Sequence, residues 1–329
     1  MAKLKVGMIG FAHTHAEGFL RALANHPEVE IAGVADENRS YVEPFDKLYP
    51  YFENYKELLA TDIGAVFICS ENVRHARLTI DAAKAKKHIF CEKPLGTTVA
   101  EMEDMVAACK KNGVQLMTAF NNRYVQAVIR AKNAVESGEI GTVIAVKGTN
   151  KGALPRREWF VDRNLSGGGA MLDHSVHVMD LFNWILQSRV VEVYAESDTL
   201  FHDIPIDDTG MIHFKYENGV IGVLDTSWSR GKAFPMKRDL TLEIIGTKGT
   251  IYVDVRKLSN EVYSNLSGNA EWSDWGDNLN SLIVGDFVRS IRSGIPVPIT
   301  GEDGLRSAVI SFAAYESSRL GRPVFLSNP

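Results

Sequence analysis

The chain has 329 residues, of which 45% are hydrophobic and 23% are charged, and its net charge at pH 7 is −5. This length predicts two domains, and this composition is ordinary for a globular protein. No basic run favours binding to nucleic acid or to an anionic membrane, and no apolar stretch approaches the roughly 18 residues of a membrane span. We therefore expect a cytoplasmic protein with reduced cysteines, and neither a nucleic acid nor a membrane as its partner.

The first third of the chain alternates short apolar runs with segments of helical spacing. The capping-box patterns that begin at Thr14 and Thr98 are expected to open two of these helices, and Gly113 is expected to end one. Alternating strands and helices predict a parallel sheet covered on both faces. Residues 1–121 are thus expected to form a doubly wound α/β domain, with strands at 5–9, 30–35, 65–69, 88–91 and 115–119.

The remaining residues, 122–329, show a different pattern. A helix is expected near 125–137, and two more close the chain near 278–292 and 302–320. Between them, two-fold alternation and short links predict a largely antiparallel sheet, which can leave one face for a partner or a substrate. Its turns are expected at 217–219 and 246–249, and its strands at 142–148, 190–198, 210–216, 220–227, 240–245 and 250–255.

The segment GMIGFAHTH follows the first strand, where a dinucleotide fingerprint belongs. Against G-x-G-x-x-G, Gly10 fits, Ala12 replaces the second glycine and His15 replaces the third. Alanine adds only a methyl group where the backbone approaches a pyrophosphate, so binding stays feasible if His15 points away from the sheet. We expect Gly10, Ala12, His13 and Thr14 to contact a dinucleotide, although a simple tight turn would explain the same residues.

Asp36 ends the second strand, where an acidic residue can accept hydrogen bonds from the adenosine ribose. Its carboxylate would repel a 2′-phosphate, so it favours NAD over NADP. Arg39 offers a phosphate contact that would partly offset this preference. A solvated acid in a turn is the alternative.

Two further strand ends carry polar residues. Ser70 and Asn72 follow the third strand, with Asn72 as a candidate helix cap, and Glu92 and Lys93 follow the fourth. Ligands of such sheets bind at the carboxyl ends of the strands, so all four are candidate cofactor contacts. Pro94 cannot continue the strand and holds Lys93 where a nicotinamide should lie. A lysine there can donate to a substrate hydroxyl oxygen, whereas a surface lysine beside a turn is the alternative.

The segment GGGAMLDHSVHVMD indicates a flexible glycine run that feeds a helix. On this helix Asp173, His177 and Asp180 are spaced at i, i+4 and i+7, which places them in one stripe. An acid one turn before a histidine can orient it or raise its basicity. A structural acid–histidine pair is the alternative reading.

The histidines and Asp173 are potential metal ligands. His174 is adjacent to Asp173 and is expected to point about 100° away from it, because each helical residue turns the chain by that angle. No zincin-type motif accompanies His13, His15, His174 or His177. We expect no metal ion.

Together these segments resemble the glucose–fructose oxidoreductase / myo-inositol dehydrogenase (Gfo/Idh/MocA) family, over essentially the whole chain. The resemblance rests on VGMIGFAHTHA, FCEKPLGTT, SGGGAMLDHSVHVMDLFNW and SSRLGRPV. It implies a Rossmann domain at 1–121, then a substrate-binding and oligomerisation α/β domain at 122–329 whose open sheet mediates homodimers or homotetramers. It also implies that Lys93, Asp173 and His177 surround the substrate beside the nicotinamide.

The expected reaction is therefore the NAD(P)-dependent oxidation of a secondary hydroxyl on a sugar, polyol or inositol-like substrate. His177 would accept the hydroxyl proton, Lys93 would hold the oxygen, and Asp173 would orient the substrate or His177. Trp159 and Phe160 could stack on the substrate ring, or could equally be core or oligomer contacts. A glycosidase that uses NAD transiently and a catalytically silent nucleotide-sensing regulator are the rival functions.

Overall fold

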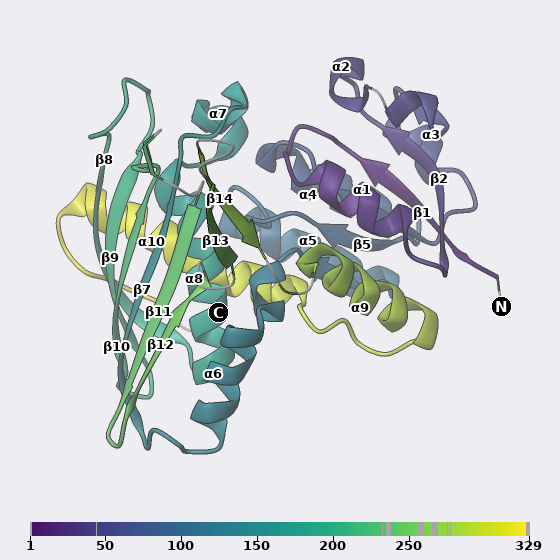
Figure 1. Ribbon diagram of the computed structural model, residues 1–329. Helices are drawn as coiled ribbons and strands as arrows, with labels where there is room; N and C mark the ends of the chain where they lie inside the picture. Colours follow the sequence, from purple (N-terminus) through teal and green to yellow (C-terminus); the bar gives the residue numbers. More distant parts are fainter. Residues whose placement is uncertain are drawn as a thin grey trace.

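The computed structural model describes residues 2–43, 45–231, 233–234, 238–255, 259–264, 269–274, 276 and 278–326. Two sheets organise these residues, each with its own helices, and they lie side by side in Figure 1. Among the described helices, none is both long and apolar enough to cross a membrane.

The first sheet has six strands in the order β3-β2-β1-β4-β5-β6, and every neighbouring pair is parallel. This confirms the doubly wound domain. The short β3 was not predicted, because two residues carry no periodicity. The strands are β1 Leu4–Ile9, β2 Val29–Ala35, β3 Tyr51–Phe52, β4 Ala65–Ile68, β5 His88–Cys91 and β6 Leu116–Thr118.

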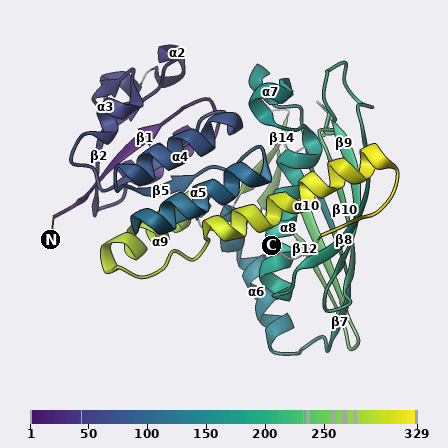
Figure 2. The ribbon, with the colours of Figure 1, turned by 180° about the vertical axis from the view of Figure 1, so that it is seen from behind.

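Helices cover both faces of this sheet. Helices α1 (Ala16–Ala24) and α9 (Leu279–Ser293) lie on the face seen in Figure 1, and α4 (His75–Lys84) and α5 (Val99–Asn112) lie on the face seen in Figure 2. Helix α9 comes from the end of the chain, yet its Phe287 packs edge-on against Phe67 of β4. The core of the first sheet is thus completed by residues far outside 1–121. Shorter helices here are α2 Arg39–Val42, α3 Tyr55–Leu59, η1 Phe45–Lys47 and η2 Asn72–Arg74.

Two of the predicted helix ends are confirmed and one is wrong. The Thr98 hydroxyl accepts from the backbone N–H of Glu101, and Gly113 ends α5 with φ of 69°. Helix α1 instead begins after His15, which makes no side-chain cap bond. The Thr14 cap fails because the loop before it is fixed by another contact, the backbone N–H of His13 donating to the Cys69 carbonyl.

The second sheet has seven strands in the order β12-β11-β7-β10-β9-β8-β15. All neighbours are antiparallel except β7 and β10, so the largely antiparallel sheet is confirmed. Both predicted turns form, with Gly219 at φ of 89° and Gly246 N–H bonded to the Gly249 carbonyl. The strands are β7 Val143–Gly152, β8 Val190–Asp198, β9 Thr209–Tyr216, β10 Ile221–Ser227, β11 Arg238–Gly246, β12 Thr250–Asp254 and β15 Val324–Phe325.

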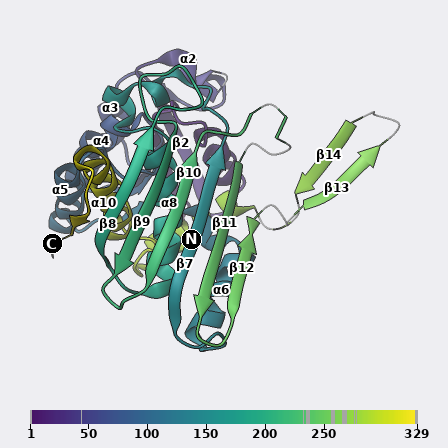
Figure 3. The ribbon, with the colours of Figure 1, turned by 90° about the vertical axis from the view of Figure 1, so that its left-hand side faces the viewer.

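A separate hairpin of β13 (Ser259–Ser264) and β14 (Asn269–Asp274) stands away from this sheet in Figure 3 and was not predicted. Figure 3 also shows that one face of the seven-stranded sheet is open, while the helices lie behind it. The covering helices are α6 Gln126–Glu136, α8 Ala170–Leu186 and α10 Gly301–Leu320, and the shorter ones are η3 Asn121–Tyr124, η4 Glu158–Val161 and α7 Arg163–Ser166.

The start of α8 is held by an acid and a tyrosine from outside the helix. The Asp207 carboxylate accepts from the backbone N–H groups of Gly169 (3.1 Å) and Met171 (2.8 Å), and Tyr315 donates its hydroxyl to the same carboxylate. A Cβ atom on Gly169 would lie 2.0 Å from the Asp207 carbonyl oxygen, and Gly167 has φ of 78°. The glycine run is therefore close-packed, and the prediction of a flexible run is wrong.

Replacing Gly169 by alanine should destabilise the protein by about 2 kcal/mol or more, because the added methyl group meets backbone that cannot move aside cheaply. The midpoint of urea unfolding measures this loss. Gly285→Ala in α9 is the matched control, since its Cβ would meet nothing within 4 Å. That control should be neutral or gain up to about 1 kcal/mol from helix propensity. Equal midpoints for the two variants would contradict the packing argument.

Candidate functional site

The loop after β1 packs closely against the end of β4. Gly10 has φ of 83°, and a Cβ there would lie 2.6 Å from the Ser70 backbone at the end of β4. The Asp36 carboxylate at the end of β2 accepts from the backbone N–H groups of Phe11 (2.7 Å) and Asn38 (2.8 Å). Burial raises the pKa of Asp36 above its ordinary value, so further donors, such as ribose hydroxyls, would stabilise the charged form.

Two buried polar atoms beside this loop have no hydrogen-bond partner among the described residues, His13 Nε2 and Asn72 Oδ1. Asn72 was predicted to cap a helix, but Glu71 occupies that position and Asn72 instead donates to the Ser166 carbonyl at 2.8 Å. Buried polar atoms without partners are rare in folded proteins. Together with the glycine at position 10, they fit a polar ligand such as a dinucleotide.

The aromatic residues that precede the glycine run lie against this loop. Trp159 donates its indole N–H to the Ala12 carbonyl at 3.1 Å and stacks on Phe160 with a centroid distance of 3.9 Å. Trp159 is only 4% exposed. Of the roles considered for it, the structure supports a core contact between the two domains, and it leaves little ring surface for a substrate.

At the end of β5, Glu92 lies completely buried among side chains of the β1 loop. Its Oε1 atom is 2.9 Å from His15 Nδ1 and 3.7 Å from His13 Nδ1, and its Oε2 atom accepts from the backbone N–H of Lys93. Burial alone would raise the pKa of Glu92, but His13, His15 and Lys93 outweigh it and hold that pKa below its ordinary range. The His15 ring lies beside this carboxylate at the end of β5.

Lys93 meets Asp173 in the space between the two sheets. Its Nζ lies 2.6 Å from Asp173 Oδ1 and 3.4 Å from the Asp173 carbonyl oxygen, and the peptide bond after it, to Pro94, is cis. The lysine side chain is 4% exposed and the aspartate 13%. Burial alone would raise the pKa of Asp173, but Lys93, His174 and His177 outweigh it and keep that pKa well below its usual range. Asp173 therefore remains a carboxylate.

His177 lies one turn further along α8 and is 6% exposed. Its Nδ1 is 3.2 Å from the amide nitrogen of Asn122, which follows β6. The β5 end and α8 thus converge through the contact of Lys93 with Asp173, as the family resemblance implied. Asn122 was missed, although its place directly after a parallel strand was a usable signal.

Two other residues of α8 differ from expectation. His174 was expected to point away from Asp173, but its Nε2 is 3.4 Å from Asp173 Oδ2, because its Nδ1 is held by the Asn150 carbonyl. Asp180, the last member of the predicted stripe, accepts from the Arg123 guanidinium at 2.9 Å beneath the site. Burial raises the pKa of Asp180 to about 6. We regard Asp180 as structural.

The remaining candidates lie at the edge of the site. Thr14 is exposed on the loop. Arg39, considered as a phosphate contact, pairs with Asp46 at 3.0 Å and lies over the ring of Tyr51.

Comparison with known proteins places these features in a family. Residues 4–120 match the model of an oxidoreductase family with an NAD-binding Rossmann fold, and residues 128–252 match the GFO/IDH/MocA C-terminal domain. The chain is 31% identical to the uncharacterized oxidoreductase YrbE of Bacillus subtilis, over 98% of this chain and 95% of that protein. It is 29% identical to the myo-inositol 2-dehydrogenase of Thermotoga maritima, over 98% of both.

Among solved structures, GenD2 from gentamicin A biosynthesis, in complex with NAD, superposes with a TM-score of 0.91 at 24% identity, covering 100% of this chain and 97% of that one. This likeness concerns the fold, which is the same in both. The chain is therefore a member of the GFO/IDH/MocA family of oxidoreductases, with an NAD-binding Rossmann domain as its first domain.

Proposed function

We propose that this protein oxidises a secondary hydroxyl group of a cyclic polyol or sugar, with NAD as the hydride acceptor. The observation that carries the proposal is the contact of Lys93 with Asp173, with His177 on the next turn of the same helix. Relatives named for myo-inositol and for levoglucosan, at 29% and 28% identity, support this substrate class. When bound, NAD supplies the redox chemistry, and the chain supplies positioning and acid–base groups.

Lys93 and Asp173 act on the substrate oxygen as a unit. The ion pair holds the lysine head group at the carboxyl edge of β5, where it can donate to the hydroxyl oxygen and stabilise the negative charge that develops there. Asp173 also accepts weakly from the Trp228 indole at 3.4 Å, so its carboxylate has a fixed orientation. Lys93 is thus presented in one position before any substrate arrives.

His177 exchanges the proton, and Asn122 selects the ring nitrogen that does so. With the Asn122 amide nitrogen facing Nδ1, the neutral ring carries its proton on Nε2 and cannot accept the substrate proton there, and in the reducing direction the acid is the imidazolium, which protonates the oxygen from Nε2. With the amide turned over, Nδ1 donates to the Asn122 oxygen and Nε2 becomes the base that oxidation needs. We therefore assign Asn122 as a positioning residue for His177.

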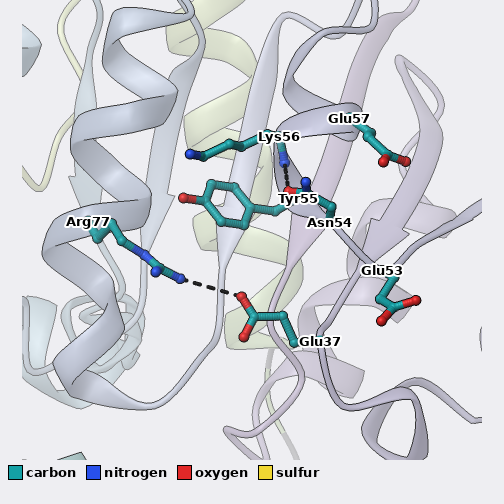
Figure 4. Close-up of a pocket in the computed structure, with 7 residues that line it drawn as sticks. All are labelled: Glu37, Glu53, Asn54, Tyr55, Lys56, Glu57 and Arg77. Atoms are coloured by element: carbon teal, nitrogen blue, oxygen red, sulfur yellow. Dashed lines mark hydrogen bonds and ion pairs between the residues drawn. The ribbon is translucent and has the colours of Figure 1, made fainter.

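The charges around Asp36 favour NAD over NADP. Arg74 and Arg77 approach the end of β2, but both pair with Glu37, at 2.6 Å and 3.4 Å. Figure 4 shows Glu37 and Arg77 in a pocket that also holds two more glutamates and one lysine, with lining residues Glu37, Glu53, Asn54, Tyr55, Lys56, Glu57 and Arg77. With Asp36 and Arg74 included, four carboxylates and three cations lie in this region, and this excess of negative charge disfavours an additional 2′-phosphate.

The open face of the seven-stranded sheet is the proposed oligomer interface. Met211, Ile221 and Tyr252 project from it, and they are 45%, 57% and 56% exposed. Charged residues lie among them on the same face, such as Lys147, Lys215 and Glu243, and a mixture of apolar and charged side chains is compatible with a protein contact. We propose that a second copy of this chain covers this face.

A screen of inositols, polyols and sugars with NAD, followed by NADH absorbance, tests the function. At least one cyclic polyol or sugar should yield NADH. Lys93→Met should lower kcat/KM by about 10³-fold, on the scale of losing one donor to a developing oxyanion, while NAD still binds. Lys84→Met, on an exposed side chain, is the matched control. Glycoside cleavage without net NADH would indicate the glycosidase, and NAD binding without any turnover would indicate the regulator.

Removing the acids near the ribose should shift the cofactor preference. The variant Asp36→Ser/Glu37→Gln frees Arg74 and Arg77 to contact a phosphate. It also removes two carboxylates that would repel the 2′-phosphate of NADP. The ratio of the Kd for NADP to the Kd for NAD should therefore fall by at least about tenfold. Isothermal titration with each cofactor measures this ratio. Asp36→Ser/Glu57→Gln is the control, because it removes the same charge without releasing an arginine. An equal shift in both variants would contradict the role of the Glu37 ion pairs.

Light scattering coupled to gel filtration tests the interface. The unmodified chain should elute as a dimer or tetramer, and Ile221→Glu should shift it towards the monomer, because a charge would be buried in the contact. Ile295→Glu is the control, since Ile295 is 45% exposed in the turn that follows α9. A monomeric unmodified chain, or dissociation in both variants, would argue against this face.

A further inference from the structure

Three potential metal ligands, His13, His15 and Glu92, form a cluster between the β1 loop and the end of β5. One ligand atom from each residue lies within 4.8 Å of the other two. His13 is 2% exposed and Glu92 is fully buried, whereas His15 is part-exposed and open to the site. We propose that these residues bind one divalent transition-metal cation of the zinc class. The metal proposal does not rest on the proposed reaction, although its residues border the candidate cofactor loop.

The geometry suits a small cation after a slight adjustment. Two ligand atoms that each lie about 2.1 Å from an ion are at most about 4.2 Å apart. The distances from Glu92 Oε1 to the Nδ1 atoms of His15 and His13, 2.9 Å and 3.7 Å, are already inside that limit. The part-exposed His15 ring can supply the remaining movement. Two imidazoles and one carboxylate are a ligand set for zinc or for iron, cobalt and manganese in the divalent state, and they leave open positions.

The negative charge of the buried Glu92 side chain also favours a bound cation. The Glu92 carboxylate is ionised and buried, and its partners are the backbone N–H of Lys93 and the ring of His15. Among the described residues no lysine or arginine side chain pairs with it. Its neighbour in the chain, Lys93, directs its Nζ to Asp173 at 2.6 Å. A buried carboxylate is stable when it is paired or when it coordinates a metal. A cation at the two Nδ1 atoms would supply this pairing.

A separate observation comes from the far side of the His13 ring. Its Nε2 atom is buried and has no hydrogen-bond partner among the described residues. Its Nδ1 atom accepts from the backbone N–H of His15 at 3.2 Å, which already leaves the proton on Nε2. Coordination through Nδ1 would replace that hydrogen bond and keep the proton on Nε2, where it could donate to a ligand beside the β1 loop. The same proposal accounts for the histidine at position 15, where the dinucleotide fingerprint has glycine. The sequence alone indicated no metal because Glu92, the third ligand, lies 77 residues beyond His15.

The test uses the full-length, tag-free protein, stripped with a chelator and titrated with Co²⁺ in the absence of NAD and substrate. We expect visible absorption bands that saturate at one equivalent, and calorimetry with Zn²⁺ should give the same stoichiometry. His15→Asn and Glu92→Gln should each weaken binding by more than about 100-fold, beyond the effect of outer-shell changes. His26→Asn, outside the cluster, should bind like the unmodified protein.

An unchanged urea midpoint for His15→Asn shows that the variant is folded, and Glu92→Gln supplies a second loss of ligand if it is not. One-equivalent binding that disappears in a folded ligand variant and persists in His26→Asn supports the site. Absence of saturable Co²⁺ absorption, or binding that survives both ligand variants, overturns it. Because no cofactor or substrate is present, failure of the dehydrogenase proposal leaves this result unaffected.

Discussion

The ion pair of Lys93 with Asp173 is the constraint on which the rest of this molecule depends. It joins the end of a strand in the first sheet to a helix that packs on the second, and both side chains are largely withdrawn from water. Burying two charges costs free energy that their attraction often fails to recover, so a buried pair is a weak source of stability. Stability therefore does not explain this ion pair, whereas its position at the carboxyl edge of the parallel sheet, where ligands bind, favours a role in function. The surrounding contacts must then hold the Lys93 and Asp173 side chains in fixed positions.

Most of these contacts anchor helix α8. Asp207 and Tyr315 hold the first N–H groups of the helix, and the glycines before it permit this close approach. Beneath the site, Arg123 pairs with Asp180. Asp173 and His177 lie between these two fixed points, so their positions follow from the helix as a rigid body. Side chains on a helix that is held at both ends lose little entropy when a ligand arrives.

The sequence predicted what depends on local pattern and missed what depends on contacts between distant residues. Strand and helix positions followed from apolar periodicity, and the Gly219 turn followed from its own backbone preference. The orientations of His15 and His174 did not, because Glu92 and the Asn150 carbonyl attract them from other parts of the chain. The position of Asn122 after a parallel strand was a usable signal, but its contact with His177 depends on the fold.

The departures from the dinucleotide fingerprint are also best understood through such contacts. A loop of glycines can be shaped by its own backbone, whereas this loop has alanine and histidine at two of the three positions. The second domain contributes to the conformation of this loop, because the Trp159 indole N–H donates to the Ala12 carbonyl. The first domain contributes as well, because Glu92 holds the His15 ring of the same loop. The conformation of the β1 loop and the packing of the two domains therefore depend on the same contact. A change at Trp159 acts on both.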